Sequence, residues 1–132
     1  MGGSIVYICY NLNYMNLNIK NETSKLKSVV LGMPTSMGET HSLADSYDAK
    51  SYHSLQNGIY PVENDIVNEM NAFEKVLKKH DVEVYRPSLI KDYNQVFARD
   101  VAFVIDDKMI ISNIIQDRYD EQDAYRKIFA RV

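Results

Sequence analysis

The chain has 132 residues, of which 45% are hydrophobic and 25% are charged, and this composition is typical of one small globular domain. Its formal net charge of -3 at pH 7, with no block of lysine or arginine, argues against a nucleic-acid partner, because binding to phosphates needs an excess of basic side chains. The single cysteine, Cys9, excludes an internal disulfide, and the apolar run 5–10 is too short to span a bilayer, so we expect a cytoplasmic protein with no membrane partner.

The N-terminal third of the chain contains one clear strand between two less regular segments. Residues 1–20 are rich in Asn and Tyr and show no helical or strand period, and we interpret them as a flexible extension. Residues 26–33 predict the first strand, because three consecutive apolar residues are followed by Gly32 and Pro34. Residues 35–60 fit neither a helix nor a strand for long, and a loop of this length is either functional or disordered.

Residues 63–80 carry the clearest helical pattern in the chain. Four apolar residues share one stripe at spacings of four, three and four: Ile66, Met70, Phe73 and Leu77. This pattern predicts a helix that packs its apolar face on the core. Residues 82–85 then predict a strand parallel to the first, because a right-handed strand–helix–strand crossover is strongly favoured.

Two apolar, β-branched runs, 101–105 and 109–113, flank the charged residues 106–108. They predict a β-hairpin whose strands are buried on both faces or nearly so. Residues 119–129 follow as a second helix, with acidic residues first and basic residues last. The polar segment 94–100 should therefore lie at the rim of a rigid sheet.

Arg99 and Asp100, at the entrance to the hairpin, have two interpretations. Charged residues usually lie outside, so the pair can be solvated or can cap local backbone groups. Alternatively, Asp100 is a fixed carboxylate at the mouth of a pocket, where it accepts two parallel N–H bonds from a planar cation. A guanidinium fits this role best, since its fork of donors matches a carboxylate.

Residues 97–100, Phe-Ala-Arg-Asp, and the hairpin 101–113 resemble the F-x-R-D strand and following hairpin of the pentein superfamily. Within it, the chain is most similar to the amidinotransferase-like group of arginine deiminases, dimethylarginine dimethylaminohydrolases and glycine amidinotransferases. The resemblance extends back to residues 25–34 and forward to 117–118, so it covers most of the chain.

This resemblance implies an α/β fold, namely a partial pentein (an α/β propeller) of about one ββαβ module plus part of the next. Residues 1–20 would be the flexible N-terminal extension, and residues 21–132 the N-terminal portion of the domain. Residues 35–60 would be a lid over a substrate pocket or a mobile surface loop. An open piece of a propeller leaves sheet edges unpaired, which predicts marginal stability or self-association.

Enzymes of this group attack a guanidinium carbon with a cysteine thiolate, helped by a histidine, while carboxylates hold the guanidinium nitrogens. The resemblance implies that Asp100 contacts the guanidino group of the substrate and that Phe97 lines the same pocket. The acidic, histidine and late cysteine segments of the group do not occur in the sequence. We therefore assign no catalytic residue, metal ligand or cofactor to this chain and expect it to be inactive alone.

The resulting hypothesis is an N-terminal fragment of a guanidine-modifying enzyme. Such an enzyme transfers or hydrolyses the amidino group of a small, arginine-like guanidino substrate; transfer and hydrolysis share one covalent intermediate, so the sequence leaves both open. One alternative is a non-catalytic truncated pentein module that binds an arginine-like cation or a partner chain. Another is a truncated product with no function of its own.

Overall fold

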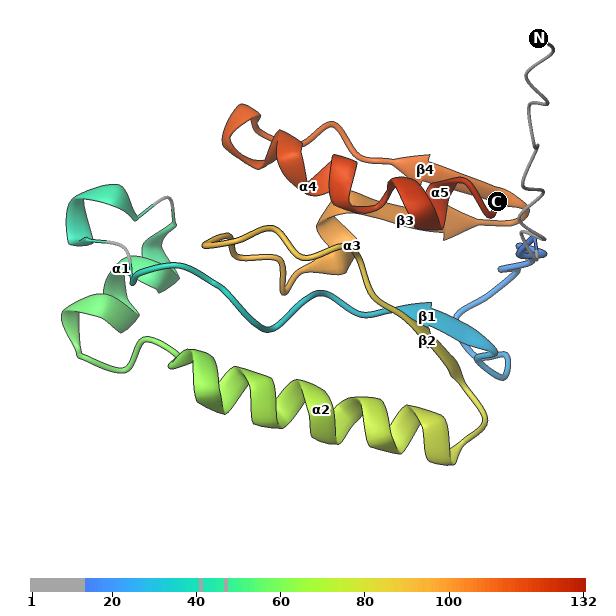
Figure 1. The fold of residues 1–132 in the computed structure, drawn as a ribbon, viewed down its shortest axis with the longest axis horizontal. Helices are drawn as coiled ribbons and strands as arrows, with labels where there is room; N and C mark the ends of the chain where they lie inside the picture. Colours follow the sequence, from blue (N-terminus) through green and yellow to red (C-terminus); the bar gives the residue numbers. More distant parts are fainter. Residues whose placement is uncertain (1–13, 41, 47) are drawn as a thin grey trace, which may run out of the picture.

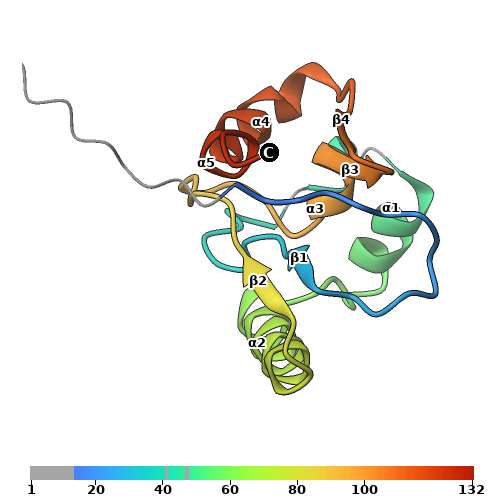
Figure 2. The same cartoon turned by 90° about the vertical axis from the view of Figure 1, so that its right-hand side faces the viewer.

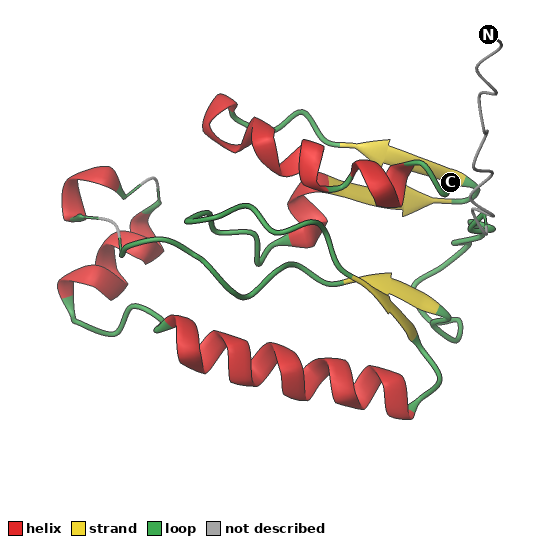
Figure 3. Ribbon diagram, viewed as in Figure 1, coloured by secondary structure: helices red, strands yellow, loops and turns green. Residues whose placement is uncertain are grey.

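The computed structural model describes residues 14–40, 42–46 and 48–132, and these form a mixture of helices and short strands (Figures 1 and 3). The strands are β1 (Ser28–Val30), β2 (Glu83–Tyr85), β3 (Ala102–Ile105) and β4 (Lys108–Ile111). The helices are α1 (Ala49–Gln56), α2 (Glu63–Lys79), α3 (Ala98–Val101), α4 (Tyr119–Ala124) and α5 (Arg126–Phe129), with 3-10 turns at Leu43–Asp45 and Gln116–Arg118. This mixed content confirms the predicted α/β class.

The elements lie in layers that Figures 1 and 2 show from two sides. The β1–β2 pair lies between the long helix α2 on one side and the β3–β4 pair with α4 and α5 on the other. Each of the two sheets has two strands, and the strands pair in parallel in the first and antiparallel in the second. The parallel pairing of β1 with β2 confirms the crossover predicted from the strand–helix–strand order.

The first core cluster lies between α2 and the β1–β2 pair. It consists of Leu31, Leu77 and Val82, with Val29, Met70 and Val84 packed against it. The predicted first strand, 26–33, is shorter in the structure, because its bonding to β2 ends at Leu31, whose N–H donates to the carbonyl of Tyr85 at 3.0 Å. Met33 instead donates its N–H to the carbonyl of Gln95 at 2.9 Å, in an isolated antiparallel bridge. This bridge ties the first sheet to the segment that leads into α3.

The predicted apolar face of α2 is correct in part. Leu77 is buried and Met70 packs on the core, but Phe73 is 50% exposed, so its prediction as a core residue is wrong. A sheet of two strands is too narrow to cover the whole stripe. Glu74, which follows Phe73 on α2, is half-buried and pairs with Arg86 Nη2 at 2.5 Å and Lys78 Nζ at 2.6 Å.

We expect Glu74 and its partners Lys78 and Arg86 to make the free energy of unfolding depend on pH. Hydrogen bonds from Lys78 first, and then from Arg86, lower the pKa of Glu74 from its usual value of 4.5. A carboxyl group whose pKa is depressed on folding stabilises the protein above its unfolded-state pKa, and this contribution is lost as the pH falls through the folded-state pKa. The wild type should therefore exceed Glu74→Gln in free energy of unfolding at neutral pH, and the difference should shrink below a pH of about 4.5.

Urea denaturation of both proteins between about pH 7 and pH 3 would measure this difference. A difference that stays constant across the range would show that the carboxylate form of Glu74 adds nothing to stability.

Residues 35–60 contain structure that the sequence did not predict. A 3-10 turn and helix α1 lie within them, so the prediction of a loop without helix is wrong. Asp48 begins α1 by accepting N–H bonds from Lys50 and Ser51, both at 2.9 Å. No residue of α1 is buried, so the helix has no apolar stripe for a periodicity argument to detect.

The predicted hairpin is present, but its predicted burial is wrong. Phe103 lies opposite Ile110 in the β3–β4 register, and these two share a face with Ile105, because side chains alternate along a strand. The three side chains are 43%, 39% and 52% exposed. We call these three residues the exposed hairpin face. The sheet is covered mainly on its other side, where Val104 and Met109 are half-buried.

The second core cluster is built from Val101, Ala124, Tyr125 and Ile128. The helix predicted over residues 119–129 is divided into α4 and α5, which meet at Tyr125. Tyr125 is 2% exposed and its ring stacks on Phe129, with the two centroids 5.9 Å apart. Burial of this ring fixes the helix pair against the end of α3, which contributes Val101.

Residues 1–13 of the predicted flexible extension lie outside the described residues. In the described part, Ile19 and Asp106 exchange two backbone hydrogen bonds of 2.8 and 2.9 Å, and Lys20 Nζ lies 2.9 Å from Asp106 Oδ1. This part of the chain is therefore attached to the hairpin turn. None of the helices in the described ranges is both long enough and apolar enough to cross a membrane.

Candidate functional site

The two residues predicted to bind substrate, Phe97 and Asp100, lie on one helical turn. Phe97 immediately precedes α3, and the N–H of Asp100 donates to the carbonyl of Phe97 at 3.1 Å. The entrance to β3 is thus a turn of helix and not extended backbone. Phe97 is 59% exposed and the Asp100 side chain is 42% exposed, so both side chains are accessible to a ligand.

This turn is held on both sides by buried residues. Val101, at its end, is fully buried, and its carbonyl accepts the N–H of Ser112 at 3.0 Å. Gln95, before its start, is also fully buried; its Oε1 accepts the N–H of Ile90 at 2.7 Å and its Nε2 donates to the carbonyl of Ser88 at 3.1 Å. Because both flanks are fixed, the backbone that carries Asp100 has little freedom.

The Asp100 carboxylate already binds a guanidinium that the chain itself supplies. Arg118 Nη1 donates to Asp100 Oδ2 at 2.9 Å, while Arg118 Nε and Nη2 donate to Glu121 Oε1 and Oε2 at 2.5 and 2.9 Å. We call Asp100, Arg118 and Glu121 the carboxylate–guanidinium cluster. The hydrogen bond to Glu121 is the largest of the causes that raise the pKa of Arg118, so the guanidinium stays charged.

Burial is uneven within this cluster. Glu121 is 1% exposed, whereas the Arg118 and Asp100 side chains are 27% and 42% exposed. Among the described residues, Arg118 is the one side chain that bonds the Asp100 carboxylate, and it engages Oδ2 alone. The Oδ1 atom of Asp100 accepts no hydrogen bond from the part of the chain that the structure describes. It can therefore accept an N–H from a ligand.

A buried hydroxyl lies within electrostatic range of the same cluster. Tyr125 Oη is buried and has no hydrogen-bond partner among the described residues. Burial raises the pKa of Tyr125 well above its usual range, and the nearby Glu121 carboxylate adds to this effect. The hydroxyl is thus neutral and can act only as a hydrogen-bond donor or acceptor.

The sequence predicts that Asp100 binds the guanidinium of a substrate, which stays a prediction, and sequence reasoning missed the internal partners Arg118 and Glu121. The available signal was the spacing of Arg118 and Glu121, three residues apart at the start of a predicted helix, where such pairs face each other. Nothing in the sequence shows that Arg118 also reaches Asp100, which lies 18 positions earlier.

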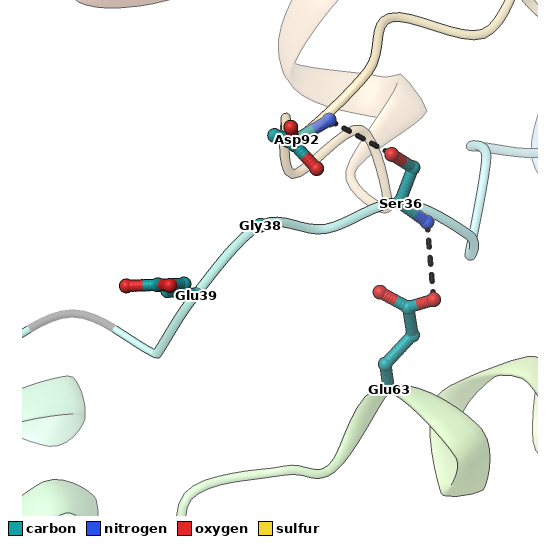
Figure 4. A pocket seen from close by; sticks show the side chains of 5 residues that line it. All are labelled: Ser36, Gly38, Glu39, Glu63 and Asp92. Carbon is teal, nitrogen blue, oxygen red and sulfur yellow. Dashed lines mark hydrogen bonds between the residues drawn. The ribbon is translucent and has the colours of Figure 1, made fainter.

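A cavity of about 700 Å³ lies at the N-terminal end of α2, away from the first core (Figure 4). Its lining residues are Ser36, Gly38, Glu39, Glu63 and Asp92. Neither Asp100 nor Phe97 is among them. The Glu63 carboxylate accepts the N–H groups of Ser36 at 3.1 Å and Met37 at 2.8 Å, so it fixes the backbone of these two residues at the edge of the cavity.

The acidic side chains of this cavity do not converge on one point. Figure 4 shows Glu39 directed away from Glu63, while the N–H of Asp92 donates to Ser36 Oγ at 2.8 Å. No group of three or more His, Cys, Asp or Glu side chains that could hold a metal ion occurs among the described residues. The lining of the cavity is polar and includes neither Asp100 nor Phe97, so the carboxylate–guanidinium cluster is a separate candidate for ligand binding.

The chain matches no protein-family model, no curated protein and no solved structure. The resemblance to the amidinotransferase-like penteins therefore depends on residues 25–34, 97–113 and 117–118 of the sequence itself.

Proposed function

We propose that the chain is the N-terminal part of an amidinotransferase-like, guanidine-modifying enzyme, in which Asp100 holds the guanidinium group of an arginine-like substrate. One observation carries this proposal: the Asp100 carboxylate accepts a guanidinium N–H at 2.9 Å through one oxygen and keeps its other oxygen free of bonds to the described residues. Because Arg118 occupies Oδ2, a ligand guanidinium would bind Oδ1 through one charge-assisted N–H bond and not through two parallel bonds to both oxygens.

The fold proposed for the whole enzyme is a pentein propeller, of which this chain forms about one ββαβ module and part of the next. The β1–α2–β2 unit and the β3–β4 hairpin lie in two separate two-stranded sheets, and we interpret them as parts of such modules. The exposed hairpin face, formed by Phe103, Ile105 and Ile110, supports the same proposal, since neighbouring modules would cover these apolar side chains.

Asp100 contributes binding and not bond breaking in this proposal. A hydrogen bond to a charged group is worth about 1.5–3 kcal/mol, which orients the guanidinium but cannot cleave it. Cleavage requires a nucleophile such as a cysteine thiolate, which attacks the guanidinium carbon, and a proton carrier for the leaving amine. We place these groups outside the described residues. The acceptor, an amine or water, decides between transfer and hydrolysis.

A second candidate function is a non-catalytic module that binds an arginine-like cation or a partner chain. The observation that favours it is that β4 pairs with one strand, β3, among the described residues, next to the exposed hairpin face. An open edge of this kind can pair with another strand. Binding of arginine without turnover, in a chain that also self-associates, would favour this second function.

Titration of the purified chain with arginine in a calorimeter tests the proposed role of Asp100. We expect weak but saturable binding, which Asp100→Asn weakens by roughly 10-fold or more, because a neutral amide loses the charge-assisted hydrogen bond. Citrulline, which is uncharged at its terminal group, should not bind.

Asp107→Asn is a matched control for this experiment, because Asp107 is also an exposed aspartate that pairs with a neighbouring cation, Lys108 at 2.9 Å. This variant should bind arginine as the wild type does. Equal arginine affinity in the wild type and in Asp100→Asn would refute the proposed function.

A further inference from the structure

We propose that Arg118 is a positioning residue for the guanidinium site: it fixes the Asp100 carboxylate through Oδ2 and thereby presents Oδ1 to the ligand. This inference rests on the proposed function of Asp100 in guanidinium binding. It deepens that function by assigning roles to Arg118 and Glu121, which the resemblance to guanidine-modifying enzymes did not supply.

Arg118 itself is held in one orientation by Glu121. Two parallel hydrogen bonds, of 2.5 and 2.9 Å, join its Nε and Nη2 to the two oxygens of Glu121. Glu121 is 1% exposed, and a buried carboxylate must keep its ionic partner because water cannot replace it. The guanidinium plane of Arg118 is therefore anchored to the first turn of α4.

The anchored guanidinium of Arg118 has one more donor, Nη1, and this donor reaches Asp100. Arg118 Nη1 lies 2.9 Å from Asp100 Oδ2, and the pair links the start of α4 to the α3 turn. A half-exposed aspartate without such a partner would sample several rotamers. Restricting it to one rotamer before the ligand arrives removes that ordering penalty from binding.

The positive charge of Arg118, next to Asp100, would by itself repel a cationic ligand. The Glu121 carboxylate offsets this charge, since it accepts two of the three hydrogen bonds that Arg118 donates within the cluster. Two carboxylates and one guanidinium leave one net negative charge. The cluster therefore still attracts a monocation, and Arg118 acts on Asp100 by orienting it and not by neutralising it.

The chain offers a matched control for Arg118. Arg126 also pairs with an acidic residue three positions away, with Nη2 at 2.7 Å and Nε at 2.9 Å from Asp123 Oδ1. Both side chains of this control pair are exposed, at 76% and 65%, and neither bonds Asp100. Arg126→Lys thus changes the same kind of residue in the same kind of pair without touching the proposed site.

The experiment compares arginine binding by calorimetry in the wild type, Arg118→Lys and Arg126→Lys. Lysine keeps the charge but cannot donate three hydrogen bonds in one plane. We expect Arg118→Lys to weaken arginine binding by roughly 5-fold, and Arg126→Lys to leave it unchanged. Three-bond NMR couplings should show one Asp100 χ1 rotamer in the wild type and an average of rotamers in Arg118→Lys.

Asp100→Glu is a second variant that alters no buried group, for the case in which Arg118→Lys does not fold. It keeps the charge but displaces the carboxylate from Arg118, so we expect weaker binding of arginine. Unchanged or tighter binding in the folded variants would overturn the positioning role while leaving the proposed function intact. Absence of arginine binding in the wild type would overturn both.

Discussion

Replacement of Gly32 by alanine should be the most damaging small substitution in the protein. An alanine Cβ at this position would lie 2.1 Å from the carbonyl oxygen of Val96 and 2.3 Å from that of Gln95, distances at which backbone must move. Overpacking a well-ordered site typically costs about 1–3 kcal/mol, and a clash with two backbone carbonyls belongs at or above the top of that range. A small domain has only about 5–15 kcal/mol of stability in total.

The clash would also reach the candidate site. Gly32 precedes Met33, whose bridge to Gln95 ties the first sheet to the segment that leads into α3 and Asp100. We therefore expect Gly32→Ala to lose arginine binding together with stability.

Chemical denaturation followed by circular dichroism measures the loss of stability, with Gly58→Ala as the control. No atom lies within 4 Å of a Cβ at Gly58, although its φ of +65° makes alanine mildly strained there. That strain should cost about 1–2 kcal/mol. If Gly32→Ala were as stable as Gly58→Ala, the close approach of the two backbone segments would be wrong.

Replacement of Arg118 by methionine should have the second large effect. Methionine retains much of the side-chain volume but removes the cation, which leaves Glu121, 1% exposed, as an unpaired buried carboxylate. Breaking a buried ion pair from one side costs about 3–5 kcal/mol.

Arg126→Met is the control for this loss of stability, and it should change the free energy of unfolding by less than about 1 kcal/mol, because the Arg126–Asp123 pair is exposed. Urea denaturation of the two variants beside the wild type measures both effects. Similar losses in the two variants would contradict the burial of Glu121.

Much of the architecture could be predicted because it follows from local patterns. Apolar runs in the first strand, the long stripe of α2 and the crossover rule together indicate the parallel β1–β2 pair, which the structure confirms. Two β-branched runs around a charged turn indicate the β3–β4 hairpin, which is also confirmed. In these elements the residues that form the structure are neighbours in sequence, so their spacing carries the information.

The wrong predictions concern segments whose structure depends on polar contacts or on contacts with residues distant in sequence. Helix α1 is begun by Asp48 and buries nothing, so no hydrophobic period marks it. Phe73 lies on the predicted apolar stripe of α2, but the two-stranded sheet is too narrow to cover it. Periodicity gives the direction of a helix face and does not give the width of the surface that it meets.

The candidate site likewise has one feature that local sequence predicts and one that depends on a distant contact. From its residue type and its place before a hairpin, the sequence predicts Asp100 as a carboxylate that binds a ligand guanidinium, and this stays a prediction. It could not indicate that Arg118 provides an internal guanidinium, since that contact depends on how α4 packs against the α3 turn through Val101 and Tyr125.

NMR titration of the side-chain carboxyl carbons with arginine tests most directly whether Asp100 binds a guanidinium. The Cγ signal of Asp100 should shift saturably on addition of arginine and should not respond to citrulline, while the signals of exposed aspartates such as Asp107 should move little. A stationary Asp100 signal, or shifts of equal size at all exposed carboxylates, would contradict a guanidinium site at this position.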